Sequence, residues 1–107
     1  MTLTKEEFRV LVMLYVANSD GQVNLDEVRA MLERTTPQVY AGVRAKFTKM
    51  NDMEVLQCIE EHKKHYLTSE TDRQELLADL KSVVEADGKL LPVETFMLRG
   101  VESVIVG

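Results

Sequence analysis

Residues 15–27 read Tyr15-Val-Ala-Asn-Ser-Asp-Gly-Gln-Val-Asn-Leu-Asp-Glu27, and residues 82–94 repeat the phrase as Ser82-Val-Val-Glu-Ala-Asp-Gly-Lys-Leu-Leu-Pro-Val-Glu94. Each copy places Asp-Gly at the end of an apolar segment and a Glu at the start of the next one, with five residues between the Gly and the Glu. A glycine at this position supplies the left-handed backbone conformation that ends many helices. The phrase therefore predicts two helix–turn–helix units near opposite ends of an α-helical chain.

Signals for the start of a helix recur between and around the two copies. Three capping boxes begin at Thr4, Asn24 and Asn51, Ser69 is a further N-cap, and Pro37 and Pro92 suit first helical positions. These signals predict six helices, over residues 5–19, 25–34, 37–49, 52–66, 70–86 and 92–106. Because no segment alternates apolar and polar residues with a period of two, we expect no sheet. The predicted fold class is all-α, a compact bundle of about six short helices with a pseudo-symmetric repeat, forming one domain over residues 1–107.

Apolar residues at helical spacing predict which side chains form the core. We expect these residues to face inward: Phe8, Leu11, Val12, Tyr15, Val28, Met31, Leu32, Tyr40, Val43, Phe47, Val55, Leu56, Ile59, Leu76, Leu77, Leu80, Val83, Val84, Phe96, Met97, Val101 and Ile105.

Composition narrows the classes of partner and compartment. The net charge is −5, which argues against nucleic acid as the main partner, because phosphate binding relies on Lys and Arg. The single cysteine, Cys58, excludes an internal disulfide and suits a reducing compartment. The first residues do not form a signal peptide, and no apolar stretch approaches the ~20 residues that cross a bilayer. We therefore expect a cytoplasmic protein without a membrane-spanning segment.

The acidic residues of the repeated phrase are candidate cation ligands. Asp20 and Asp87 stand at the ends of predicted helices, where the helix dipole disfavours negative charge by roughly 0.3–1 kcal/mol. A bound cation would offset this cost, and so would local hydrogen bonds within a turn. We therefore take Asp20, Glu27, Asp87 and Glu94 as a candidate metal site. The alternative is that Gly21 and Gly88 only end helices and that Glu27 only caps one, without a ligand.

The phrase matches only part of an EF-hand loop. With Gly21 or Gly88 at the sixth loop position, the first position is Val16 or Val83, so a primary carboxylate ligand is missing in both copies. This excludes a standard EF-hand. Oxygen ligands alone favour Ca²⁺, Mg²⁺ or Mn²⁺, and four side chains are fewer than the 6–8 ligands that calcium takes. Backbone carbonyls or water would have to complete the coordination.

Residues 16–27 and 83–94, with their paired Asp-Gly…Glu motifs, resemble the tellurite-resistance TerB-like family. The resemblance implies an all-helical fold with pseudo-symmetric halves in which the acidic motifs come together. It also implies a metal-binding role for Asp20, Glu27, Asp87 and Glu94, linked to the response to tellurite and other chemical stress, and an association with membrane-bound complexes.

A second group of possible ligands lies in residues 52–66. Cys58, His62 and His65 follow one another at helical spacing and are zinc-ligand types, but no fourth ligand is evident. We expect a packed cysteine and solvated histidines instead. A Cys–His nucleophile pair would need an oxyanion site and an orienting third group, which nothing in the sequence marks, and no general acid or base is placed beside the acidic residues, so we expect no enzymatic activity. Two functions stay open: a module that binds a divalent cation, a protein partner or a second copy through the paired motifs, and a purely structural protein-interaction domain.

Overall fold

Side-chain caps determine where each helix begins. The computed structural model describes residues 2–18, 23–86 and 99–103, which contain α1 (Lys5–Ala17), α2 (Leu25–Leu32), α3 (Pro37–Phe47), α4 (Asp52–Tyr66) and α5 (Glu70–Val84). Residues 99–103 are also helical. Each of the five labelled helices follows a capping side chain that accepts a backbone N–H from its first turn: Thr4, Asn24, Thr36, Asn51 and Ser69. The predicted starts of these five helices are confirmed.

The predicted ends are less accurate. The sequence pattern placed the ends of α2, α3 and α5 two residues too late, because the chain leaves the α-helix through tighter turns. Arg34 N–H donates to Met31 O, Lys49 N–H to Lys46 O, and Ala86 N–H to Val83 O, each across three residues instead of four. Helix α1, which was predicted to end at residue 19, ends at Ala17, whereas α4 ends at Tyr66 as predicted. Of the predicted helix over residues 92–106, only 99–103 lies in the described part.

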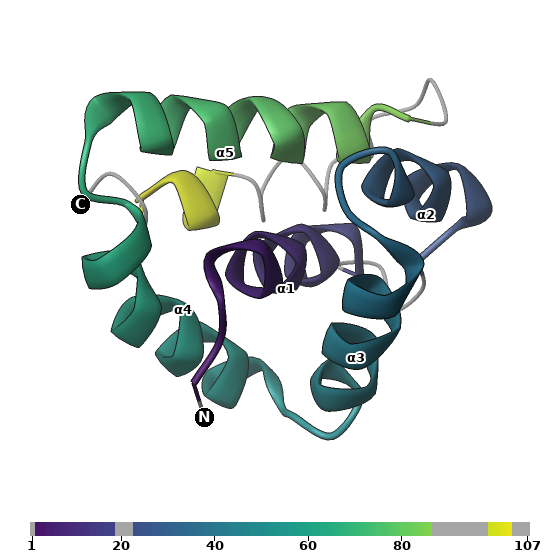
Figure 1. The fold of residues 1–107 in the computed structure, drawn as a ribbon, viewed down its shortest axis with the longest axis horizontal. Helices are drawn as coiled ribbons and strands as arrows, with labels where there is room; N and C mark the ends of the chain where they lie inside the picture. The colour runs from purple at the N-terminus through teal and green to yellow at the C-terminus, as the bar shows by residue number, and fades with distance from the viewer. Residues whose placement is uncertain (1, 19–22, 87–98, 104–107) are drawn as a thin grey trace.

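Helix α1 is the centre of the bundle. Figure 1 shows α1 in the middle, with α5 along one side, α4 and α3 along the other, and α2 next to the far end of α5. Helix α1 contacts all four other labelled helices. Nine of its thirteen residues are buried, and eight of those are the consecutive run Val10–Ala17. The predicted apolar stripe on α1 was therefore too narrow, since residues 10–17 of the helix are covered on every side.

The core is otherwise close to the prediction. Within the described ranges no residue lies in a strand, so the all-α fold class is confirmed. The expected core residues of α2–α5 are buried or half-buried, with Val28, Leu32, Phe47, Leu56 and Leu77 at its margin. Val101 is buried, whereas the predicted core residues Phe96, Met97 and Ile105 lie outside the described residues. Residues 87–94, which hold the Asp-Gly pair and the Glu of the second copy, also lie outside them. Among the helices described, none is long and apolar enough to span a membrane.

Candidate functional site

Glu27 is the member of the predicted metal site that lies among the described residues. It occupies the first turn of α2, where Asn24 and Glu27 form a capping box. Its Oε1 atom accepts the backbone N–H of Asn24 at 3.1 Å, and its own N–H donates to Asn24 Oδ1 at 2.8 Å. The capping role expected of Glu27 is therefore confirmed.

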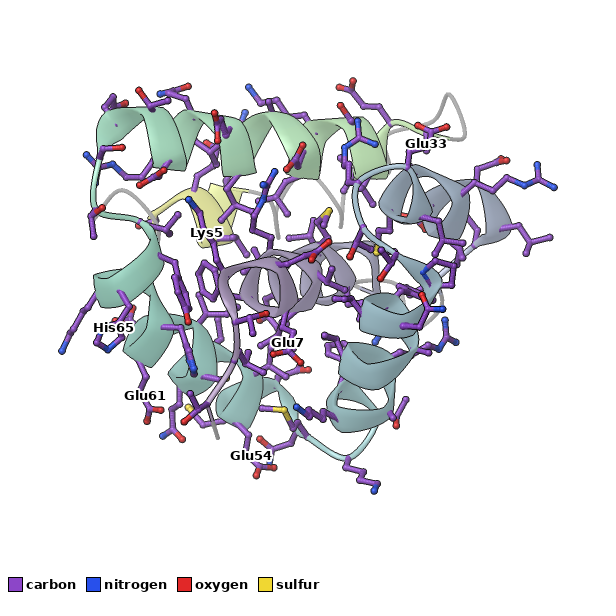
Figure 2. The ribbon with its side chains drawn as sticks, in the orientation of Figure 1. Lys5, Glu7, Glu33, Glu54, Glu61 and His65 are labelled. Carbon is purple, nitrogen blue, oxygen red and sulfur yellow. The ribbon has the colours of Figure 1, made fainter. Side chains whose placement is uncertain are left out.

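The burial of Glu27 goes beyond what capping requires. Only 2% of its surface is exposed, which makes it one of two buried polar residues among those described. Glu54 forms the same capping box with Asn51 at the start of α4, yet it is exposed and projects from the bundle (Figure 2). Because the same two hydrogen bonds form at an exposed site, they do not explain the burial of Glu27. A buried carboxylate needs compensation by hydrogen bonds or positive charge.

The other three predicted ligands, Asp20, Asp87 and Glu94, lie outside the described residues. Within the described part of the chain, no three His, Cys, Asp or Glu side chains are grouped so that they could hold a metal ion. Among the described residues, the candidate site therefore rests on one carboxylate, which is separated from the Asp20-Gly21 pair by five residues in the sequence.

The histidines of α4 do not form a second site. His62 is buried, its Nε2 accepts the backbone N–H of Leu3 at 3.1 Å, and its Nδ1 donates to the carbonyl of Cys58 at 2.7 Å. Both ring nitrogens are therefore used within the fold. His65 is exposed and projects from the outer side of α4, as does Glu61 (Figure 2). The expected solvated histidine is thus confirmed for His65 and wrong for His62, which packs near Phe8 and Tyr66.

Cys58 is a core residue, as expected. Burial raises the pKa of its thiol, and the negative charge of Glu61 raises it further. A raised pKa disfavours the thiolate, which is the nucleophilic and metal-binding form. In the described structure Cys58 therefore packs in the core and contacts Nδ1 of His62 through its carbonyl and, at 3.6 Å, through its thiol.

Comparison with known proteins places the chain in a family. Residues 7–106 match the family model described as "Tellurite resistance protein TerB", which covers nearly the whole chain. No curated protein and no solved structure gave a significant match. The match includes both Asp-Gly…Glu motifs and all five labelled helices except the first two residues of α1. The chain therefore belongs to the TerB family of tellurite resistance proteins.

Proposed function

We propose that this TerB domain is a non-catalytic module that binds a divalent cation through Asp20, Glu27, Asp87 and Glu94, and that it acts in tellurite resistance. The observation that carries the proposal is the burial of Glu27 in the first turn of α2, the helix that follows the first Asp-Gly pair in the sequence. Membership in the family supports the link to tellurite.

The chemistry of the four residues favours a hard cation. All four side chains are carboxylates, and oxygen ligands suit Ca²⁺, Mg²⁺ or Mn²⁺ better than soft metals. Carboxylates that are brought close together repel one another, and a divalent cation relieves that repulsion. A carboxylate held out of water, as Glu27 is, gains more from a nearby cation than an exposed one, because charges interact more strongly at low dielectric.

Two described features support a non-catalytic role. His62 has both ring nitrogens engaged in backbone hydrogen bonds, so it is not available as a general base. Cys58 is buried with a raised pKa, so its thiolate is disfavoured. The proposed activity is therefore binding.

Thermal unfolding with and without cation tests the proposal. A cation that binds the native state stabilises it by ~2.7 kcal/mol at a hundredfold excess over its Kd. We expect millimolar Ca²⁺ or Mn²⁺ to raise the melting temperature of the native protein. The double variant Asp20→Asn, Asp87→Asn should remove this rise, and so should Glu27→Gln, whose amide oxygen still accepts the Asn24 N–H.

Glu54→Gln is the matched control, because Glu54 makes the same capping box on α4 without a preceding Asp-Gly turn. This variant should keep the full response to cation. If millimolar cation leaves the melting temperature of the native protein unchanged, or if Glu54→Gln loses the response as fully as Glu27→Gln, the metal site is wrong. The alternative is then a protein-interaction domain, which light scattering of the purified chain would examine first by its oligomeric state.

A further inference from the structure

A hollow opens where the last turns of α1 and α3 meet the first turn of α4. Its volume is about 430 Å³, within the ~300–1,000 Å³ typical of sites for small molecules. Five apolar side chains line it, of which Leu14 and Val55 are buried and the other three are half-buried: Val23, Phe47 and Met50. The hollow is therefore lined by apolar side chains from four separate segments of the chain, together with the polar residues Asn18, Arg44, Thr48 and Asp52.

Arg44 supplies a positive charge to this hollow. Its Nη1 donates to the hydroxyl of Tyr40 at 2.7 Å, and its guanidinium carbon lies 6.0 Å from the centre of the Tyr40 ring. These contacts hold the guanidinium in place, and it forms no ion pair with any described residue. A guanidinium has five N–H donors, so most of them remain for a ligand carboxylate.

Asp52 supplies a negative charge to the same hollow. It stands in the first turn of α4 and makes no side-chain hydrogen bond or ion pair with the residues that the structure describes. Its charge also acts on Tyr15 of α1, whose pKa is raised chiefly by burial and then by Asp52. Asp52 and Arg44 thus line one hollow with opposite charges, yet they do not pair with each other.

Helix dipoles account for only part of this arrangement. Acid at the start of α4 and base near the end of α3 are each favoured by the dipole of their own helix. That effect does not explain why both charges border a hollow that is also lined by half-buried apolar side chains. A ligand that carries both signs would complement both residues and cover the apolar side chains of the hollow.

We propose that the hollow binds a small zwitterion with an apolar body, such as an amino acid or short peptide with a large apolar side chain. Arg44 binds its carboxylate, Asp52 binds its ammonium group, and the apolar body covers Leu14, Phe47 and Val55. A ligand with one charge gains from one of these residues and is repelled by the other. The proposal is independent of the divalent cation site.

Three compounds that share a phenyl ring test the charge requirement. L-Phenylalanine is zwitterionic, 3-phenylpropanoate is an anion, and 2-phenylethylamine is a cation. The dipeptide Leu-Phe adds a zwitterion with a longer distance between its charges. Each compound is titrated into the ¹⁵N-labelled full chain in EDTA, which removes divalent cations, and the amide shifts are followed by NMR. We expect at least one zwitterion to bind more tightly than either singly charged compound and to shift the amides of residues that line the hollow.

Four variants locate the site. Arg44→Met and Asp52→Asn should each weaken binding of the zwitterion by about tenfold, the loss expected for one hydrogen bond between charged groups. Lys49→Met and Asp26→Asn are the matched controls, since they remove charges from the same kinds of helix end outside the hollow. Both controls should bind as the native protein does. Circular dichroism of every variant confirms that the chain remains helical.

Three results would overturn the proposal. The first is the absence of saturable shifts with either zwitterion at millimolar concentration. The second is equal or tighter binding of 3-phenylpropanoate or 2-phenylethylamine, which would show that only one charge matters. The third is a loss of binding in the controls as large as that in Arg44→Met or Asp52→Asn, which would place the ligand elsewhere.

Discussion

The backbone N–H of Leu3 donates a hydrogen bond to Nε2 of His62, across 3.1 Å and 59 positions of sequence. The carbonyl of the same residue accepts the hydroxyl of Tyr66 at 2.5 Å, and the Leu3 side chain is buried. Helix α4 thus holds both backbone polar groups of Leu3. This arrangement fixes the segment before α1 against the bundle.

Replacement of His62 should destabilise the fold. His62→Leu fills the site with an apolar side chain but leaves the buried Leu3 N–H without its acceptor. We expect the free energy of unfolding to fall by about 1–3 kcal/mol. Urea unfolding measures the loss. His65→Leu is the matched control on the exposed side of α4, and we expect it to change stability by less than about 0.5 kcal/mol. If the two variants lost the same free energy of unfolding, the hydrogen bond of Leu3 would contribute nothing to stability.

The hydrogen bonds of His62 also predict its tautomer. Because Nε2 accepts from Leu3, the ring hydrogen of the neutral form lies on Nδ1, which donates to the Cys58 carbonyl. We expect ¹⁵N NMR of the ring at neutral pH to show a protonated Nδ1 and an unprotonated Nε2. His65 serves as the internal reference for an exposed ring. A signal from His62 with the hydrogen on Nε2 would contradict the contact with Leu3.

The sequence predicts best those features that depend on neighbouring residues. Five helix starts were predicted correctly because each depends on one capping side chain within the same turn. Helix ends were predicted less well because the last turns tighten to three-residue hydrogen bonds, for which no side chain gives a signal. The sequence did contain a signal for the central position of α1. Residues 10–17 form an unbroken apolar run, which indicates a helix that is buried on all sides.

Functional features that join distant segments were not predictable. The sequence indicated that Glu27 caps α2, but its burial depends on what packs over that turn. His62 was expected to be solvated because its neighbours in sequence are charged, whereas its position is decided by Leu3, Phe8 and Tyr66. The hollow beside Arg44 and Asp52 is formed by four segments, and no local pattern marks it.

Asp79 should contribute more to stability than an exposed acid. From α5 it pairs with Arg9 of α1 and with Nε of Arg34 at 3.2 Å, and its side chain is only 16% exposed. Asp79→Asn removes the charge from both pairs, and we expect a loss of about 1–3 kcal/mol, because the guanidinium groups remain partly exposed and are solvated in part. Asp26→Asn, which affects an exposed pair with Arg29 at 3.9 Å, should cost less than about 0.5 kcal/mol. Similar losses in urea unfolding would contradict a special role for Asp79.

Because α1 lies at the centre of the bundle, a cavity made in α1 should reduce stability more than a cavity made near the edge of the bundle. Leu11 is almost fully buried on α1, whereas Leu32 at the end of α2 is half-buried. Leu11→Ala should cost about 2–5 kcal/mol, the range for a leucine deleted from a closed core. Leu32→Ala should cost clearly less, because water and neighbouring side chains can fill the space. Equal free energies of unfolding for the two variants would show that α1 is not the rigid centre of the bundle.

The lowered pKa of Glu7 predicts that the stability of the protein depends on pH in the acidic range. Its pKa is lowered from the ordinary value of 4.5, first because its carboxylate accepts the backbone N–H of Thr4 at 2.8 Å, and also because Lys46 lies 3.7 Å away, while burial acts in the opposite direction. Figure 2 shows Glu7 between α1 and α3, the helix that carries Lys46. A carboxyl group with a lowered pKa in the folded state stabilises that state above its unfolded pKa, and this contribution is lost as the pH falls through the folded pKa.

We therefore expect the stability of the native protein to decrease below about pH 4.5 more steeply than that of Glu7→Gln, which has no carboxylate to titrate at this position. Urea unfolding between pH 3 and pH 7 gives the difference between the two proteins at each pH. Lys46→Met removes one of the causes of the lowered pKa but keeps the hydrogen bond from Thr4, so it should retain a smaller part of the pH dependence. Parallel curves for the native protein and Glu7→Gln would contradict the lowered pKa, because a group whose pKa is the same in the folded and unfolded states adds no slope.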